Sequence, residues 1–199
     1  MPSSTRRARE RASTRERIVE AALTVLEAEG AAALTIRRIA ADVEYTAPIV
    51  YQYFASKDAL IVELIAHGYE LMLAEAKRIA GEERDVDRRF LGVARGYMRF
   101  AAEHPHLFAV MNNGIVIAAD ERQRVTKPTV DLLLELITTW ADAHGVVLAD
   151  PVEAGEIVWG ALYGIASLGQ LGVIGAERAE RLGEQALATI LRGWLAGPT

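Results

Sequence analysis

The stretch "LTIRRIAADVEYTAPIVYQYF", residues 34–54, holds two short runs in which apolar residues recur at helical spacing. The apolar residues are Ile36, Ile39 and Val43 in the first run, and Val50 and Phe54 in the second. A second helix running from about Thr46 to Phe54 would have Thr46 as its N-cap and Pro48 in its first turn. Two short helices separated by about four residues describe a helix-turn-helix, whose second helix lies in the major groove of DNA.

Helical spacing continues on both sides of this stretch. The preceding helix is expected to open near Ser13 or Thr14, because Ser13 and Glu16 have capping-box spacing, and to end at Gly30. The following helix is expected to be capped by Ser56 and to run to about Ala80. Nothing in the chain reads as a strand, so the sequence predicts an all-α fold of about nine helices.

The net charge of −5 is distributed unevenly along the chain. Residues 1–57 carry a net charge of +2, and the remainder carries −7. The first 17 residues hold six arginines against two glutamates. Such a segment is either a local contact for a polyanion or a solvated tail, and charge alone does not separate the two.

The absence of cysteine excludes disulfides, thiol catalysis and zinc sites that use thiolates, and it fits a cytoplasmic protein. Residues 157–176 form twenty positions without a charge, a length that could span a bilayer. Five glycines and the polar Ser167 and Gln170 instead favour a helix buried within the protein or between subunits. No membrane partner is therefore expected.

Residues 14–60 resemble the DNA-binding domain of TetR-family transcriptional regulators. The matching segments are "TRERIVEAAL" (14–23), Gly30, "LTIRRIA" (34–40), "APIVYQYF" (47–54) and "SKDAL" (56–60). The resemblance implies double-stranded operator DNA as a partner. The implied groove-facing residues are Arg37, Ala47, Pro48, Ile49 and Gln52, and the implied phosphate contacts are Thr35, Thr46, Tyr51, Tyr53 and Lys57.

Two of these side chains, and the neighbouring Arg38, could also have a purely structural role or lie in solvent. Tyr51 could belong partly to the small core of the domain, and Lys57 followed by Asp58 could simply start a solvated helix. Arg38 could point to solvent or contact DNA.

The turn departs from the family's usual Ala-Gly-Val, because Val43-Glu44-Tyr45 stands there. The turn requires a left-handed residue, so Glu44 is expected to cost ~1 kcal/mol relative to glycine. Tyr45 replaces a small apolar residue, and its hydroxyl could face the core, the solvent or DNA.

For the remainder, the resemblance implies a helical ligand-binding and dimerisation domain over residues 61–199, after a flexible basic arm (1–13) and the helix-turn-helix domain (14–60). The last two helices would form the homodimer, with Gly160 and Gly164 allowing close approach. An unknown small-molecule effector would bind in the C-terminal domain. Aromatic, methionine and polar residues suited to its pocket, or to plain core, are Tyr97, Met98, Phe108, Met111, Asn112, Trp140, Trp159 and Tyr163.

Catalysis is the rival class of function. The four histidines show no triad and no metal-ligand spacing, and no glycine-rich phosphate loop follows a strand. No catalytic residue, metal ligand or cofactor is therefore assigned. The sequence predicts a DNA-binding transcriptional regulator, a repressor released from a palindromic operator by a small apolar or amphipathic ligand. The alternative is a helical ligand-binding or adaptor protein without DNA-binding activity.

Overall fold

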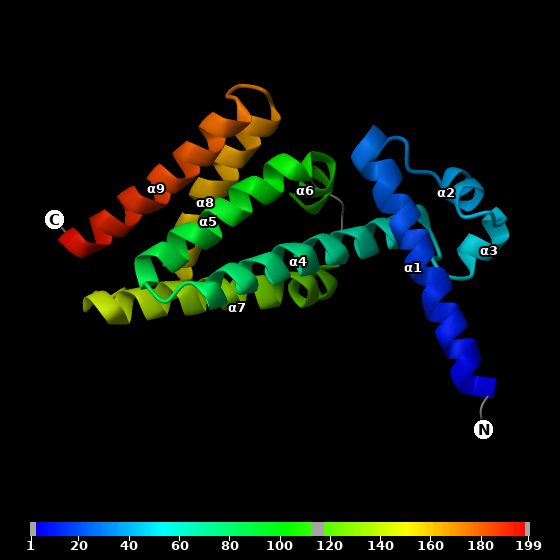
Figure 1. The fold of residues 1–199 in the computed structure, drawn as a ribbon, viewed down its shortest axis with the longest axis horizontal. Helices are drawn as coiled ribbons and strands as arrows, with labels where there is room; N and C mark the ends of the chain where they lie inside the picture. Colours follow the sequence, from blue (N-terminus) through cyan, green and yellow to red (C-terminus); the bar gives the residue numbers. More distant parts are fainter. Residues whose placement is uncertain (1–2, 113–117, 198–199) are drawn as a thin grey trace. The chain divides into compact units, whose positions relative to one another are not determined.

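The computed structural model describes residues 3–112 and 118–197, and every regular element within them is a helix. Figure 1 draws the nine helices of this described part, and they confirm the predicted all-α fold. They are α1 (Ser3–Glu29), α2 (Ile36–Asp42), α3 (Ala47–Tyr51), α4 (Lys57–Glu82), α5 (Val86–Glu103), α6 (Pro105–Asn112), α7 (Ala119–His144), α8 (Pro151–Gln170) and α9 (Ala176–Ala196).

The chain divides into two compact units. The first comprises Met1–Gly68 together with His106–Ala118, and the second comprises Tyr69–Pro105 and Ala119–Thr199. The first unit is therefore built from two separate stretches of chain. The domain boundary predicted at residue 60 stays a prediction.

Helix α1 begins at Ser3, about three turns earlier than the predicted start near Ser13. The early residues are mainly arginine, alanine and glutamate, which are good helix formers. Arg6 Nε donates to Glu10 Oε1 at 2.8 Å across one turn and supports the extension. The described part of the predicted flexible arm is thus helical.

The core of the first unit is apolar and centres on α1. Its fully buried side chains include Ile18, Ala22, Leu26, Ile39, Val50 and Leu64. Helix α6 closes this core, because a Cβ on Gly68 of α4 would lie only 2.5 Å from Met111 Sδ. His106 Nδ1 lies 3.0 Å from the carbonyl oxygen of Glu27, so the ring donates to one of the last carbonyls of α1.

The second unit packs α5, α7, α8 and α9 against one another. Trp140 of α7 is fully buried, and its indole Nε1 donates to Asp87 Oδ1 of α5 at 2.7 Å. Gly183 of α9 lets Met98 approach closely, since an added Cβ would lie 2.7 Å from Met98 Cγ. The first contact joins α7 to α5, and the second joins α9 to α5.

Within the described residues, no helix is long and apolar enough to cross a membrane. Most of the uncharged segment lies in α8, which buries Val158, Leu162 and Ala166 on one face. Ile157 and Leu168 remain 48% and 42% exposed within this single chain. Helix α8 therefore has one face covered by its own chain and another that is not.

Candidate nucleic-acid interface

Helix α3 is shorter than predicted, ending at Tyr51 instead of Phe54. The amides of Gln52 and Tyr53 donate to the carbonyls of Ile49 and Val50, three residues back, at 3.0 Å each. Bonds of this spacing tighten the chain into a 3₁₀-like turn and end the α-helix.

The turn between α2 and α3 has the left-handed conformation that its position requires. Glu44 has φ 60°, and it is the one non-glycine residue with positive φ in the described part of the chain. The amide of Glu44 donates to Ala41 O at 3.1 Å, and the amide of Tyr45 donates to Ala40 O at 2.8 Å. This pair of bonds is a Schellman motif, in which glycine is the usual left-handed residue.

The side chain of Tyr45 is partly buried and faces α1. Arg17 Nη1 of α1 donates to the Tyr45 hydroxyl at 3.2 Å, and the guanidinium carbon lies 5.4 Å from the ring centroid. Arg17 Nη2 also lies 3.4 Å from Val43 O. The sequence left open whether the Tyr45 hydroxyl faces the core, the solvent or DNA. In the structure it contacts α1 at the edge of the small core.

Two threonines occupy the N-cap positions of the helix-turn-helix. Thr35 Oγ1 accepts a hydrogen bond from the Arg38 amide at 3.1 Å, so it caps α2. Thr46 has the extended backbone of an N-cap, but its side chain makes no capping bond. The predicted cap position of Thr46 is confirmed, and its exposed hydroxyl keeps its hydrogen-bonding capacity for another partner.

Helix α3 presents most of its side chains outward. Val50 is its one buried residue, while Pro48 and Gln52 are exposed and Ala47 and Ile49 are partly exposed. Tyr51 is 53% exposed, which argues against a role in the small core. The predicted groove-facing residues Ala47, Pro48, Ile49 and Gln52 are therefore accessible, while Val50 and the buried Phe54 just after the helix face the core.

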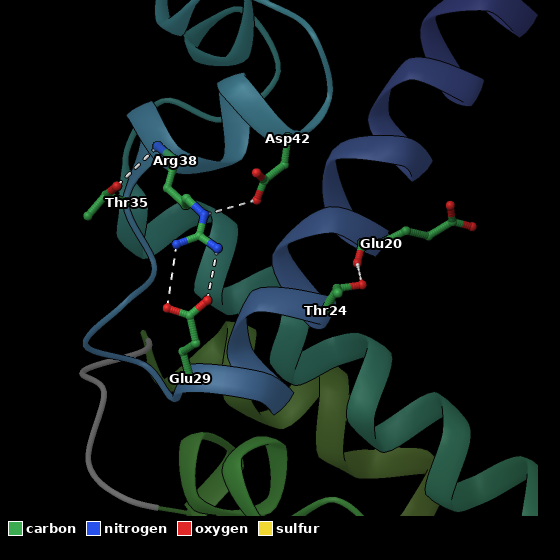
Figure 2. A network of polar contacts seen from close by, with 6 residues as sticks. All are labelled: Glu20, Thr24, Glu29, Thr35, Arg38 and Asp42. Atoms are coloured by element: carbon green, nitrogen blue, oxygen red, sulfur yellow. Dashed lines mark hydrogen bonds and ion pairs between the residues drawn. The ribbon is translucent and has the colours of Figure 1, made fainter.

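Neighbouring arginines of α2 differ in their surroundings. Arg38 donates to Glu29 Oε1 at 2.8 Å and to Asp42 Oδ2 at 3.3 Å, as Figure 2 shows. These contacts, chiefly the hydrogen bond with Glu29, raise the pKa of the Arg38 guanidinium. Arg37 is exposed and makes no hydrogen bond or ion pair within the described residues. Arg37 thus has no partner among the described residues, whereas the equally exposed Arg38 is paired with carboxylates of its own unit.

The sequence left open that Lys57 simply lies in solvent at the start of a helix, but the structure shows a contact within the protein. Its Nζ donates to the carbonyl oxygen of Ala31, in the loop after α1, at 3.1 Å. The ammonium has two further donors, so a phosphate contact remains compatible with this bond.

Arginines of α1 contact the chain around the end of α3, a feature that the sequence reading missed. Arg11 Nη2 donates to the carbonyl of Gln52 at 3.1 Å, and its guanidinium lies over the Tyr53 ring at 5.3 Å. Arg15 lies over the Phe54 ring at 5.1 Å and pairs with Glu63 of α4. Such stacks draw on cation–π attraction. The four-residue spacing of Arg11 and Arg15, which places both on one face of α1, was the sequence feature that could have predicted these contacts.

The predicted pocket residues are divided between the two units. Phe108, Met111 and Asn112 of α6 belong to the first unit, and the other five belong to the second. Met98 and Trp140 are buried in packing contacts with α9 and α5. In the second unit, the rings of Trp159 and Tyr163 lie 5.9 Å apart and nearly parallel.

Tyr97 and Tyr69 add to this aromatic pair. Burial, together with the neighbouring phenols of Tyr69 and Tyr163, raises the pKa of Tyr97, despite an opposing hydrogen bond with Trp159. Burial also raises the pKa of Tyr69, against the nearby charge of Arg122. Tyr69, Tyr97, Trp159 and Tyr163 form the aromatic cluster of the second unit, and Tyr69 was absent from the predicted set. Within the described residues, no group of three or more His, Cys, Asp or Glu could hold a metal ion.

Two family models match the chain. "Bacterial regulatory proteins, tetR family" matches residues 18–64, and "Tetracyclin repressor-like, C-terminal domain" matches residues 90–190, about half of the chain. Among curated relatives, the nucleoid occlusion factor SlmA of Vibrio vulnificus (strain YJ016) is 30% identical over 130 residues. That match spans 65% of this chain and 65% of the relative, so about a third of the relative's length is left unmatched.

Solved structures share the fold. A protein of unknown function from Rhodococcus sp. RHA1 superposes with a TM-score of 0.80 at 24% identity, over 91% of this chain and 95% of that one. The fatty acid degradation regulator FadR from Bacillus halodurans gives a TM-score of 0.74 at 17% identity, over 90% and 95% of the two chains. At these identities the likeness concerns the fold alone.

The two N-cap threonines give a matched test of capping. Thr35→Ala is expected to lower the free energy of unfolding by about 1 kcal/mol, because the Arg38 amide loses its acceptor. Thr46→Ala, which removes the same atoms without a capping bond, should cost less than about half of that. Urea unfolding followed by far-UV circular dichroism compares the two. Equal losses would contradict the difference in capping.

Proposed function

The chain belongs to the tetR family of bacterial regulatory proteins, and from this premise we propose that it is a transcriptional regulator that binds a palindromic operator as a homodimer. It acts as a repressor, and a small apolar or amphipathic ligand releases it. One observation carries the DNA-binding part: α3 buries Val50 and leaves its other side chains accessible beside Arg37, which has no partner among the described residues. A helix presented in this way can place side chains against base edges in the major groove.

The contacts divide into those that read bases and those that hold phosphate. Arg37 and Gln52 can form hydrogen bonds with base edges, while Ala47 and Ile49 can pack on a thymine methyl. Thr46, Tyr51, Tyr53 and Lys57 keep polar groups suited to phosphate oxygens. The arginines in the first turns of α1 add positive charge, so binding should weaken steeply as salt rises.

Selection from a pool of random duplexes tests the function directly. The wild-type chain should enrich a palindrome, since two copies of α3 would read equivalent half-sites about one helical turn apart. Enrichment of no sequence at all would favour the adaptor alternative over the regulator.

Dimerisation is proposed through α8 and α9, because one short helix reads too few base pairs for useful specificity. Within one chain, a Cβ added to Gly160 or Gly164 would meet no atom within 4 Å. Beside these glycines, Ile157 and Leu168 are about half exposed. An apolar face with open glycines suits close approach of a second copy.

The effector is proposed to bind at the aromatic cluster of Tyr69, Tyr97, Trp159 and Tyr163. Phenols are ordinarily neutral at physiological pH, and burial moves the pKa of Tyr69 and Tyr97 further above that range, so both hydroxyls keep their proton for a hydrogen bond. The half-exposed Trp159 and its neighbour Tyr163 offer flat apolar surface. An amphipathic molecule would place its apolar part on the rings and its polar end at the phenols.

Adjacent arginines test the reading of bases. Arg37→Ala should weaken binding of the selected palindrome roughly tenfold and relax the preference at one position of each half-site. Arg38→Ala is the matched control, and it should leave the preferred sequence unchanged because Glu29 and Asp42 hold that guanidinium. Repeating the selection with each variant measures both. A relaxed preference in Arg38→Ala alone would reverse the two assignments.

Leucine in place of Gly164 tests the dimer. A Cβ at this position meets no atom within 4 Å in the single chain, so Gly164→Leu should fold but sediment as a monomer at micromolar concentration and bind the palindrome weakly. Gly81→Leu is the matched control, because a Cβ on Gly81 of α4 also meets no atom within 4 Å. A dimeric Gly164→Leu, or a monomeric Gly81→Leu, would contradict the proposed interface.

A panel of straight-chain alcohols and fatty acids tests the effector site. At least one member should release the palindrome and change tryptophan emission, since Trp159 would lose contact with water. Tyr163→Ala should then require a higher concentration of that compound for release. The apolar-effector proposal fails if the panel leaves the complex intact, or if Tyr163→Ala responds like the wild type.

A further inference from the structure

We propose that Arg17 and Tyr45 form a latch that holds the turn of the helix-turn-helix closed around Glu44 and thereby positions α3 for DNA. The proposal rests on the proposed DNA-binding function for its consequence, but the latch itself is a property of the free protein. It assigns both residues to positioning, since each acts through the turn.

The turn needs such a device because Glu44 occupies a conformation that side chains with a Cβ adopt reluctantly. The remaining positive-φ residues of the described chain are glycines 30, 145, 172 and 197. Glutamate lacks the short polar side chain that lets asparagine or aspartate bond to its own backbone there. A strained residue of this kind persists where surrounding contacts hold it in place.

Contacts from Arg17 flank Glu44 on both sides. One arm of the guanidinium reaches the carbonyl of Val43 at 3.4 Å, and the other reaches the Tyr45 hydroxyl at 3.2 Å. The same group lies over the Tyr45 ring at 5.4 Å. The Val43 carbonyl is among the last of α2 and has no partner within that helix. A single planar side chain thus ties the residue before Glu44 to the residue after it.

The position of Tyr45 in the chain links the latch to DNA reading. Tyr45 directly precedes Thr46, the N-cap from which α3 begins. Fixing Tyr45 against α1 therefore fixes the point where α3 starts, while Arg11 binds the Gln52 carbonyl where α3 ends. Val50 is the one buried side chain within α3, and the buried Phe54 follows it, so these two arginines of α1 supply the polar contacts that position the helix at its two ends.

A guanidinium suits this role, and an ammonium does not. Arginine can donate from two nitrogens in fixed directions while stacking on a ring, whereas lysine offers one point charge on a flexible stem. Arg17→Lys keeps the charge and removes the latch. A simple phosphate contact at position 17 would survive this change, so the variant separates the two roles.

The rescue experiment uses Arg17→Lys, Glu44→Gly and the double variant, with the palindrome selected by the wild type as probe. Arg17→Lys should bind it roughly three- to tenfold more weakly, the range expected when a left-handed residue loses its support. Glu44→Gly removes the strain, so in the double variant it should restore binding to about the wild-type level. Wild-type binding by Arg17→Lys, or no restoration by Glu44→Gly, would overturn the latch.

Amide hydrogen exchange in the absence of DNA gives the second readout. The Glu44 and Tyr45 amides close the turn through Ala41 O and Ala40 O. They should exchange faster in Arg17→Lys, return to slow exchange in the double variant, and leave exchange across α4 unchanged. Unchanged exchange at residues 44 and 45 in Arg17→Lys would also refute the latch. If the wild type selects no palindrome, the proposed function fails, and exchange at these amides still decides whether the latch exists.

Discussion

Burial of the apolar stripe of α1 is the constraint on which the first unit depends. Helices as short as α2 and α3 are not stable in isolation, because forming the first turn costs more than a few hydrogen bonds return. Ile18, Ala22 and Leu26 of α1 are fully buried and supply the surface against which α2 packs, and α3 packs in turn against α2. Once α1 is in place, its arginines reach Tyr45, Gln52 and Phe54 on either side of α3. One helix therefore provides both part of the core and the polar contacts around α3, the proposed DNA-reading helix.

Donors from three other helices contact the end of α1 and the loop that follows it. His106 of α6 donates to Glu27 O, Lys57 of α4 donates to Ala31 O, and Arg38 of α2 pairs with the Glu29 carboxylate. A helix C-terminus has unpaired carbonyls and a partial negative charge, so cationic and N–H donors are the groups expected there. Each of the three donors comes from a different helix. The last turn of α1 thus joins the neighbouring helices of its unit.

The spacing of apolar residues and the positions of capping and turn residues predicted the helices well, because both are local properties of the sequence. Helices α2 and α9 and the N-cap position of Thr46 follow from apolar spacing and turn residues, and the left-handed Glu44 follows from its place in the turn. Tyr45 could not be placed from sequence, since its partner Arg17 lies 28 residues away. Lys57 and Arg38 were uncertain for the same reason: their partners, Ala31 and Glu29, are set by tertiary packing. The pocket residues were the hardest, because aromatic residues at helical spacing suit a core and a ligand site equally.

The contribution of α6 to the first unit has a consequence for biosynthesis. His106 and Met111 complete packing around Glu27 and Gly68, although more than forty residues separate Gly68 from Met111. A nascent chain that has emerged only as far as α4 would therefore expose the apolar surface that α6 later covers. Packing of the first unit, which contains the proposed DNA-reading helix, is therefore complete only after α6 has been synthesised.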